Sequence, residues 1–307
     1  MIHAVLLQYD SNETGSDEVS VLYRALSPSR KAKADSFKNP EAFKASVFAG
    51  RLLEKHLARL TGLDASGLTY ADGGNGRPVL PRTENTAAVD FNISHTDGAA
   101  LAVFKLFAAG EQPLIPCVGC DVERLGGRFK RPDMPDNIIN RFFAGSEQKL
   151  FSELAARPGF AAVRSSDTDQ RRSAAEYKED LFFRFWTAKE AHAKMTGRGI
   201  SGTLGRETVV LAECRPGYGS ENDCTCRLAY SDGSVLISGR YPDRDPGQCY
   251  WQNSKHCSGQ STGQHTEHCS GQSAVNQGDL AVTVAADRSL AGQPFVLTYE
   301  TIHGLLP

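Results

Sequence analysis

The sequence predicts a globular protein that mixes helices and strands. The chain has 307 residues, of which 40% are hydrophobic, and that is enough to bury a substantial core. Charged residues make up 23% of the chain, which argues against a coiled coil or a disordered protein. Segments with helical and with strand periodicity follow one another, and no apolar run reaches the length of about eighteen residues that a membrane span needs.

Composition also predicts the compartment and a ligand type. Residues 1–7 have neither the basic start nor the apolar length of a secretory signal. Eight cysteines in a chain of this length form no disulfide scaffold, so we expect reduced thiols and a cytoplasmic protein. The net charge is −2, yet residues 21–60 hold nine Lys or Arg against three acids. Such a segment suits a phosphate-rich ligand, an acidic partner or a solvated helix face.

The first predicted helix covers residues 39–60. Asn39 can cap it, Pro40 suits its first position, and Gly62 can end it. Apolar residues recur at helical spacing in between. A turn-rich stretch, residues 72–78, follows this helix.

Three strands are expected next. Residues 87–93 and 99–107 form a predicted hairpin, because Asp97-Gly98 between them is a hairpin turn signal. A third short strand covers residues 117–122.

Two later helices complete the regular part of the prediction. One covers residues 138–154 with an interruption at Gly145, and the other covers about 179–195. The second helix is expected to stop at the Thr-Gly-Arg-Gly stretch of residues 196–199.

Two stretches, residues 157–178 and 252–278, are predicted to be inserts. The second is of low complexity, holds a near-repeat of His-Cys-Ser-Gly-Gln-Ser, and is flanked by strand-like runs at 249–251 and 280–284. We interpret it as a long, mostly disordered hairpin loop. Zinc binding is the alternative, because the stretch has suitable ligand types, although their spacing fits no zinc-finger pattern. These ligand types are Cys257, His265, His268 and Cys269.

Two carboxylates, Asp121 and Glu123, come at the end of the strand 117–122. Because side chains alternate along a strand, both point to the same face. Paired carboxylates without imidazole or thiolate neighbours suit a hard cation such as Mg²⁺. A solvated strand end would give the same pattern.

Glu190 and Lys194 are four residues apart on the last predicted helix and therefore share a face. Such a pair is commonly a surface ion pair. In a functional interpretation, Glu190 is a third carboxylate for the metal, and Lys194 balances charge that develops at a phosphate. His192 points elsewhere and is expected to be a surface or packing residue.

Ser94 and His95 end the first strand of the hairpin. Adjacent strand residues face opposite sides, so the two cannot form a nucleophile–base pair. Contact with a phosphate through the Ser94 hydroxyl or backbone and the His95 ring is the functional interpretation, and a polar turn is the alternative.

Taken together, these motifs resemble those of the 4'-phosphopantetheinyl transferases, in particular the larger, pseudo-dimeric type that activates peptide and polyketide synthetase carrier domains. The resemblance covers most of residues 1–250 and residues 279–286, and it leaves both inserts unmatched. Cys120 departs from it, because the family commonly has an aliphatic residue at that position. The matching segments are Asn-x-Ser-His at 92–95, Gly-x-Asp-x-Glu at 119–123, Trp-x-x-Lys-Glu-Ala-x-x-Lys at 186–194, the basic stretch at 27–33, Gly-Arg-Pro at 76–78, Arg-Phe-Phe at 141–143 with Glu147, and Gly-Arg-Gly-Ile at 197–200.

The resemblance implies transfer of the 4'-phosphopantetheine arm of coenzyme A to a serine of an apo acyl or peptidyl carrier protein, with release of 3',5'-ADP. It also implies an α+β fold of two similar subdomains related by a pseudo-twofold, with the active site in the cleft between them. We expect the N-terminal subdomain over residues 1–113 and the C-terminal subdomain over residues 114–307. A monomer that binds neither nucleic acid nor membrane is expected.

Roles for individual residues follow from the same resemblance. Mg²⁺ would be held by Asp121, Glu123 and Glu190. Glu190, or a water that it orients, would take the proton of the acceptor serine, and Lys194 would be the second catalytic residue. Whether Ser46 or Val47 contacts the ligand is left open. Coenzyme A would be bound by Arg30, Lys33, Arg77, Ser94, His95 and Lys189.

Two other functions compete with this interpretation. A Mg²⁺-dependent nuclease-like phosphodiesterase would share the carboxylates and the basic segment, but such enzymes favour Glu-x-Lys on the strand, where this chain has Arg124-Leu125 after Glu123, and a net basic binding face. A non-catalytic module that binds coenzyme A or a carrier protein is the other candidate. The presence of all the predicted metal carboxylates and of Lys194 argues against it.

Overall fold

The fold is described by a computed structural model. It describes residues 1–10, 15–64, 67–81, 89–108, 111, 116–126, 129, 131, 133–156, 174–216, 224–241, 250–253 and 280–306. No helix in these ranges is long and apolar enough to span a bilayer. The helices are α1 (Ser16–Arg24), α2 (Pro28–Asp35), α3 (Pro40–Thr61), α4 (Met134–Phe142), α5 (Gly145–Ala155), α6 (Ala174–Thr196) and α7 (Ile302–Leu305).

Two four-stranded sheets form the centre of the molecule, in the orders β12-β1-β5-β4 and β10-β9-β11-β6. Only β1 and β12 pair in parallel within them. Two smaller pairs, β2 with β3 and β7 with β8, lie outside these sheets. The strands are β1 (Ile2–Gln8), β2 (Ala71–Asp72), β3 (Pro78–Val79), β4 (Val89–Thr96), β5 (Ala99–Leu106), β6 (Val118–Arg124), β7 (Val209–Pro216), β8 (Cys224–Tyr230), β9 (Val235–Tyr241), β10 (Tyr250–Asn253), β11 (Leu280–Ala286) and β12 (Phe295–Glu300).

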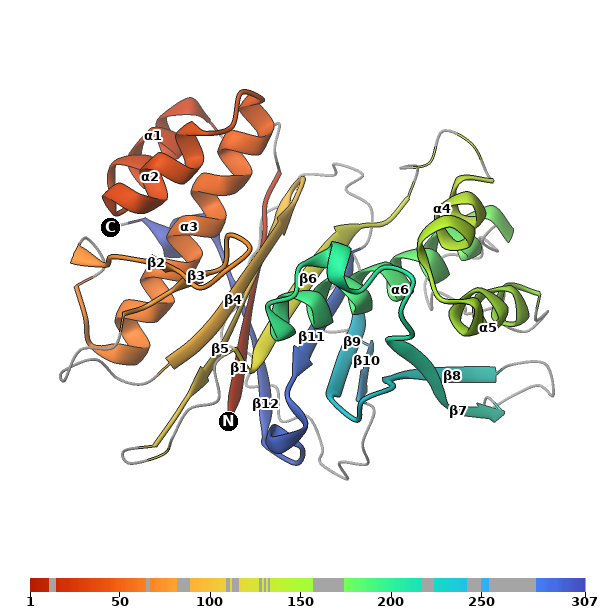
Figure 1. The fold of residues 1–307 in the computed structure, drawn as a ribbon. Helices are drawn as coiled ribbons and strands as arrows, with labels where there is room; N and C mark the ends of the chain where they lie inside the picture. The colour runs from red at the N-terminus through yellow and green to blue at the C-terminus, as the bar shows by residue number, and fades with distance from the viewer. Residues whose placement is uncertain are drawn as a thin grey trace.

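The two sheets stand next to each other, with α1–α3 on one outer side and α4–α6 on the other (Figure 1). Hydrophobic side chains between the sheets form one cluster, which includes Leu6 and Val103 from the first sheet and Val122 and Val282 from the second. A second cluster packs α3 onto the first sheet, and a third packs α6 onto the second. Hydrophobic side chains therefore pack against both faces of each sheet, although β12 at the edge of the first sheet is partly exposed.

Strands β4 and β6 join the two sheets through side chains. They belong to different sheets, and side chains on one face of β4 reach the neighbouring strand. Asp90 Oδ2 accepts hydrogen bonds from the backbone N–H groups of Cys117 (2.6 Å) and Val118 (3.0 Å). Asn92 Oδ1 accepts one from the N–H of Cys120 (3.1 Å). Backbone donors at the edge of the second sheet are thereby satisfied by the first.

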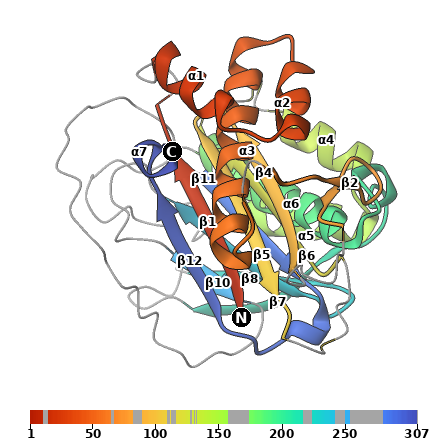
Figure 2. The same ribbon diagram turned by 90° about the vertical axis from the view of Figure 1, so that its left-hand side faces the viewer.

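The C-terminal segment returns to the first sheet. Strand β12 pairs with β1, and α7 packs beside α3, where Arg51 Nε donates to the carbonyl of Leu305 at 3.0 Å. Figure 2, which looks onto the first sheet, shows α3 across its outer face with α7 close by. Residues 295–305 thus build onto the N-terminal part of the chain.

Most of the expected elements are confirmed. Helix α3 has Asn39 as its cap and Gly62 in the left-handed conformation at its end, and β4 and β5 form the hairpin around Gly98. Helix α6 begins at Ala174, earlier than expected, so the last residues of the predicted insert 157–178 are helical. The remainder of that insert, residues 157–173, lies outside the described residues.

The predicted hairpin across residues 252–278 is wrong in its pairing. Strands β10 and β11 do not pair with each other, because β9 lies between them and pairs with both. Strand β11 has two neighbours and is buried along its whole length, so its sequence gives no sign of which strand it pairs with. Residues 254–278 themselves, with the proposed zinc ligands, lie outside the described residues.

Helix α6 lies close against β6 because position 119 is glycine. A Cβ atom built on Gly119 would collide with the carbonyl oxygen of Ala191 and the backbone nitrogen of Met195. The glycine of the Gly-x-Asp-x-Glu motif therefore sets the distance between the strand with Asp121 and the helix with Lys194.

We predict that Gly119→Ala destabilises the protein by about 1–3 kcal/mol, the usual cost of overpacking, because backbone rather than a flexible side chain blocks the new methyl group. Denaturant unfolding measures the change. Gly145→Ala is the matched control, since a Cβ there meets no atom within 4 Å and its backbone is not left-handed. Equal stability of both variants would contradict this account of the helix position.

Candidate functional site

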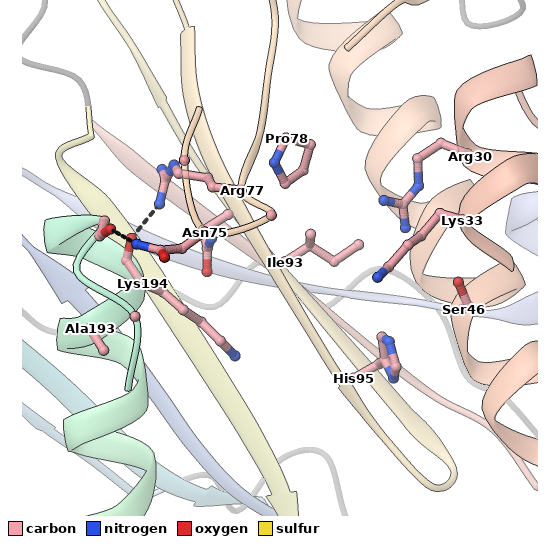
Figure 3. A pocket seen from close by; sticks show the side chains of 15 residues that line it. Arg30, Lys33, Ser46, Asn75, Arg77, Pro78, Ile93, His95, Ala193 and Lys194 are labelled. Carbon is pink, nitrogen blue, oxygen red and sulfur yellow. Dashed lines mark hydrogen bonds between the residues drawn. The ribbon is translucent and has the colours of Figure 1, made fainter. Parts of the chain in front are cut away.

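A pocket lies where the first sheet meets the C-terminal end of α6. Figure 3 shows Arg30, Lys33 and Ser46 on one side and Asn75, Arg77 and Lys194 on the other, with Ile93 and His95 between them. The helices α2 and α3 thus supply one wall, and α6 with the turn between β2 and β3 supplies the other. The lining residues are Arg30, Lys33, Ser46, Gly74, Asn75, Gly76, Arg77, Pro78, Asn92, Ile93, His95, Ala193, Lys194, Gly197 and Gly199.

The wall formed by α2 and α3 holds buried polar groups that lack protein partners. Arg30 is only 8% exposed, and its Nε has no hydrogen-bond partner among the described residues. The same holds for the hydroxyl of the buried Ser46. An unsatisfied buried donor costs free energy, so these atoms are suited to receive an anionic ligand.

His95 is half-buried beside three cations. Burial first, and then the charges of Lys194, Arg30 and Lys33, together lower the pKa of its ring to about 4. The ring also meets Phe37 edge-on, with centroids 6.2 Å apart. At neutral pH His95 is therefore uncharged, and it can offer one ring nitrogen as donor and the other as acceptor.

Lys194 is held by a hydrogen-bonded triad with Ser94 and Asp121. Its Nζ donates to Asp121 Oδ1 at 2.7 Å and to Ser94 Oγ at 3.0 Å, and Ser94 Oγ donates to the same carboxylate oxygen at 2.7 Å. Burial opposes the charged amine, but Asp121, Cys120 and Glu190 outweigh it, so the pKa of Lys194 is raised. Lys194 is a permanent cation at the edge of the pocket.

The predicted metal carboxylates are only partly brought together. Among the residues that the structure describes, no three carboxylate, imidazole or thiolate side chains converge to hold a metal ion. Glu123 Oε2 accepts from Thr96 Oγ1 at 3.3 Å. Burial and the charge of Asp121 raise the pKa of Glu190, while Lys194 opposes the shift, so the two carboxylates influence each other.

Asp121 nevertheless keeps one oxygen available. Its Oδ1 takes both hydrogen bonds of the triad, whereas Oδ2 is buried without a partner among the described residues. A buried carboxylate oxygen without a donor is unfavourable unless a cation or a proton meets it. The oxygen-only chemistry of these residues fits a hard divalent cation.

Arg77 is largely committed to the protein. Its Nη1 donates to the carbonyl of Lys194 at 2.6 Å, and its Nη2 donates to Asp90 Oδ1 at 2.8 Å. Further bonds from Nη2 reach the carbonyls of Phe91 (2.7 Å) and Val118 (3.1 Å). Only Nε is buried without a partner in the described chain, so Arg77 shapes the pocket more than it can bind in it.

Lys189, predicted to contact coenzyme A, is bonded to protein groups outside the pocket lining. Lys189 is fully buried, and its Nζ donates to the two carboxylate oxygens of Glu147 at 2.9 and 2.7 Å and to the carbonyl of Arg206 at 2.8 Å. Lys189 and Lys194 are five residues apart, about 140° around a helix, and so cannot both face the pocket. Helical spacing could have shown this.

His192 and several unpredicted residues have structural roles. His192 Nε2 is 2.8 Å from Asp232 Oδ2, away from the pocket, as the sequence suggested. Asp90 and Asn75 were missed, and Asn92 was recognised only as part of the Asn-x-Ser-His motif, without a role. Asp90 and Asn92 could have been found by period-2 spacing from Ser94, whereas the sequence gives no signal for the role of Asn75.

We predict that the ring of His95 titrates near pH 4 in the free protein, as followed by NMR with His95→Gln for assignment. This pKa lies below the unfolded value of about 6.5, so the unfolded chain binds more protons between the two. The stability contributed by neutral His95 is therefore present above about pH 6.5 and lost as the pH falls toward 4. Lys33→Ala should raise the pKa, because it removes a nearby cation. A wild-type midpoint near 6.5 would contradict the burial of the ring.

The chain is similar in sequence to known proteins. A model of the 4'-phosphopantetheinyl transferase superfamily matches residues 117–225, which include β6 and α6. The chain is 26% identical to 4'-phosphopantetheinyl transferase psf-1 of Bacillus pumilus over 212 residues, 69% of this chain and 75% of that protein. It is 25% identical to 4'-phosphopantetheinyl transferase HetI of Nostoc sp. over 201 residues, 65% and 70% of the two chains. With 4'-phosphopantetheinyl transferase Sfp of Bacillus subtilis the identity is 25% over 176 residues, 57% and 62%.

Proposed function

We propose that the chain is a 4'-phosphopantetheinyl transferase, which transfers the 4'-phosphopantetheine arm of coenzyme A to a serine of an apo acyl or peptidyl carrier protein and releases 3',5'-ADP. The observation that supports this most is the triad of Lys194, Ser94 and Asp121 at the edge of a cationic pocket. Asp121 and Lys194 both lie in the matched segment.

Phosphates of coenzyme A would occupy the cationic pocket. Arg30 and Lys33 would bind the 3'-phosphate region, where the unpartnered Arg30 Nε and Ser46 hydroxyl supply donors. His95 would add a neutral hydrogen bond, and Ser94 and Lys194 would contact the pyrophosphate end. Arg77 would contribute through Nε alone.

Mg²⁺ would be held by Asp121, Glu123 and Glu190, with Asp121 Oδ2 as its natural donor because Oδ1 already serves Lys194. When bound, the ion would neutralise pyrophosphate charge and act as a Lewis acid. Lys194 would stabilise the negative charge of the departing phosphate from its fixed position.

Glu190 would accept the proton of the attacking serine, directly or through a water. Its raised pKa makes it a stronger base than an exposed glutamate, and it is half-buried beside the triad. Attack on phosphorus then depends on alignment and charge neutralisation, which fixed side chains provide.

The architecture is compatible with two subdomains related by a pseudo-twofold. Each would be a four-stranded sheet covered by one long helix, α3 in the first and α6 in the second. The proposed boundaries, 1–113 and 114–307, then require that β12 cross back to the first sheet. We further propose that the protein acts in the cytoplasm as a monomer.

Incubation with coenzyme A, Mg²⁺ and a panel of apo carrier proteins should add the phosphopantetheine mass to a carrier and release 3',5'-ADP. Intact-mass spectrometry detects the adduct, and a known transferase run in parallel serves as the positive control. If no carrier of a broad panel gains the mass, the proposed reaction is wrong. Release of nucleotides from DNA instead would favour the nuclease.

Substitutions of the carboxylates and of Lys194 should impair metal binding and turnover in different ways. Asp121→Ala or Glu123→Ala should weaken metal binding and slow turnover together, with part of the Asp121→Ala loss recovered at high Mg²⁺. Glu190→Gln should keep coenzyme A binding and lose turnover by about 100-fold or more, the range for a general base. Lys194→Ala should lose turnover without rescue by Mg²⁺, since it removes positive charge at the leaving phosphate.

Transfer rate and coenzyme A affinity across a Mg²⁺ titration measure these differences. Glu153→Gln and Lys149→Ala are matched controls, because these two residues form a weak exposed pair on α5 with a separation of 3.9 Å. Normal turnover by Glu190→Gln would show that Glu190 is neither base nor essential ligand.

A further inference from the structure

The turn between β2 and β3 contacts the end of α6 within one wall of the pocket. Asn75 Nδ2 donates to the carbonyl of Gly197 at 2.6 Å, and Arg77 Nη1 donates to the carbonyl of Lys194 at 2.6 Å. Carbonyls in the last turn of a helix lack partners within the helix. The turn therefore caps α6 and forms one wall of the pocket with it, and dashed lines in Figure 3 mark the hydrogen bonds between them.

The backbone at Asn75 is shaped for this contact. Its φ of 51° is left-handed, a conformation that Asn adopts more readily than most residues. Its side-chain carbon Cγ would lie 3.5 Å from a Cβ atom at Gly199, so the turn and the loop after α6 pack closely. Asn75, Gly197 and Gly199 all line the pocket.

We propose that Asn75 is a positioning residue that holds the β2–β3 turn against the end of α6, so that the two form one wall of the pocket, and thereby sets the affinity for the nucleotide end of coenzyme A. The inference rests on the proposed function. A ligand that contacts a wall built from two segments gains affinity when the segments are already in place, because it does not have to order them. Asn75 joins the helix end that carries Lys194 to the turn that carries Arg77, and it acts without touching the reacting atoms.

Two variants separate this role from a contribution to fold stability. Asn75→Gly removes the side-chain amide, and glycine adopts the left-handed conformation without steric cost. Asn75→Ala also removes the amide, but alanine is strained in that conformation. We expect the same rise in both variants, about three- to tenfold, in the Kd for 3',5'-ADP and in the KM for coenzyme A, as for one lost hydrogen bond. The kcat and the KM for the carrier protein should stay within about twofold. Only Asn75→Ala should show a clear fall in melting temperature.

Calorimetric titration with 3',5'-ADP, steady-state kinetics and thermal unfolding provide the measurements. Asn137→Ala is the matched control, because the amide of Asn137 bonds locally to Asp133 on the exposed side of α4, at 2.9 Å. A Kd of Asn75→Gly equal to that of the wild type would overturn the inference. The inference would also be overturned if the Kd rose only in Asn75→Ala, together with a fall in the melting temperature of that variant. A wild-type protein that binds neither 3',5'-ADP nor coenzyme A would overturn the proposed function, and this inference with it.

Discussion

Side-chain hydrogen bonds from β4, rather than backbone pairing between strands, join the two sheets, and the geometry of the site depends on these bonds. Asp90 and Asn92 accept from three N–H groups at β6 and its preceding residue, so the edge of the second sheet is satisfied by the first. The next residue on the same face, Ser94, therefore arrives opposite Asp121. Each of these polar groups is buried, so removal of one would leave its partner unsatisfied at a cost of about 1–3 kcal/mol.

Helix α6 is fixed from two sides, and this decides where Lys194 points. On one side, the buried pair of Lys189 and Glu147 holds the helix to α5. On the opposite side, the hydrogen bond between Thr187 and Thr283 (2.8 Å) and the bonds of Lys194 to Ser94 and Asp121 hold it to the strands. A buried ion pair is costly to desolvate, and that cost is met only where geometry and further hydrogen bonds are good, as they are at Glu147. The pair of Lys189 and Glu147 thus fixes the position of α6 and does not line the pocket.

Local sequence signals predicted local structure well, and failed where a choice depended on distant partners. The cap at Asn39 and the turn at Gly98 are decided by residues nearby, so α3 and the β4–β5 hairpin followed from the sequence. The pairing of β11, buried between β9 and β6, depends on strands far along the chain. For the same reason, residue type was enough to identify the pocket residues on α2 and β4. The sequence could not show that Arg77 donates to four protein acceptors, because these lie on distant segments.

Charge is divided between the two halves of the site, and the division gives a direction to a bound ligand. The first half supplies Arg30 and Lys33, whereas the second supplies Asp121 and Glu190. An anion alone favours the first half and a cation alone the second, because each charge is attracted to its opposite in a poorly solvated site. Lys194 stands at the boundary, bonded to Asp121 and lining the pocket. A ligand with a free phosphate at one end and a metal-bridged pyrophosphate at the other matches this order in one orientation only. The opposite charges of the two halves, which β4 and β6 join, therefore favour one orientation of such a ligand and decide which of its phosphorus atoms faces the acceptor.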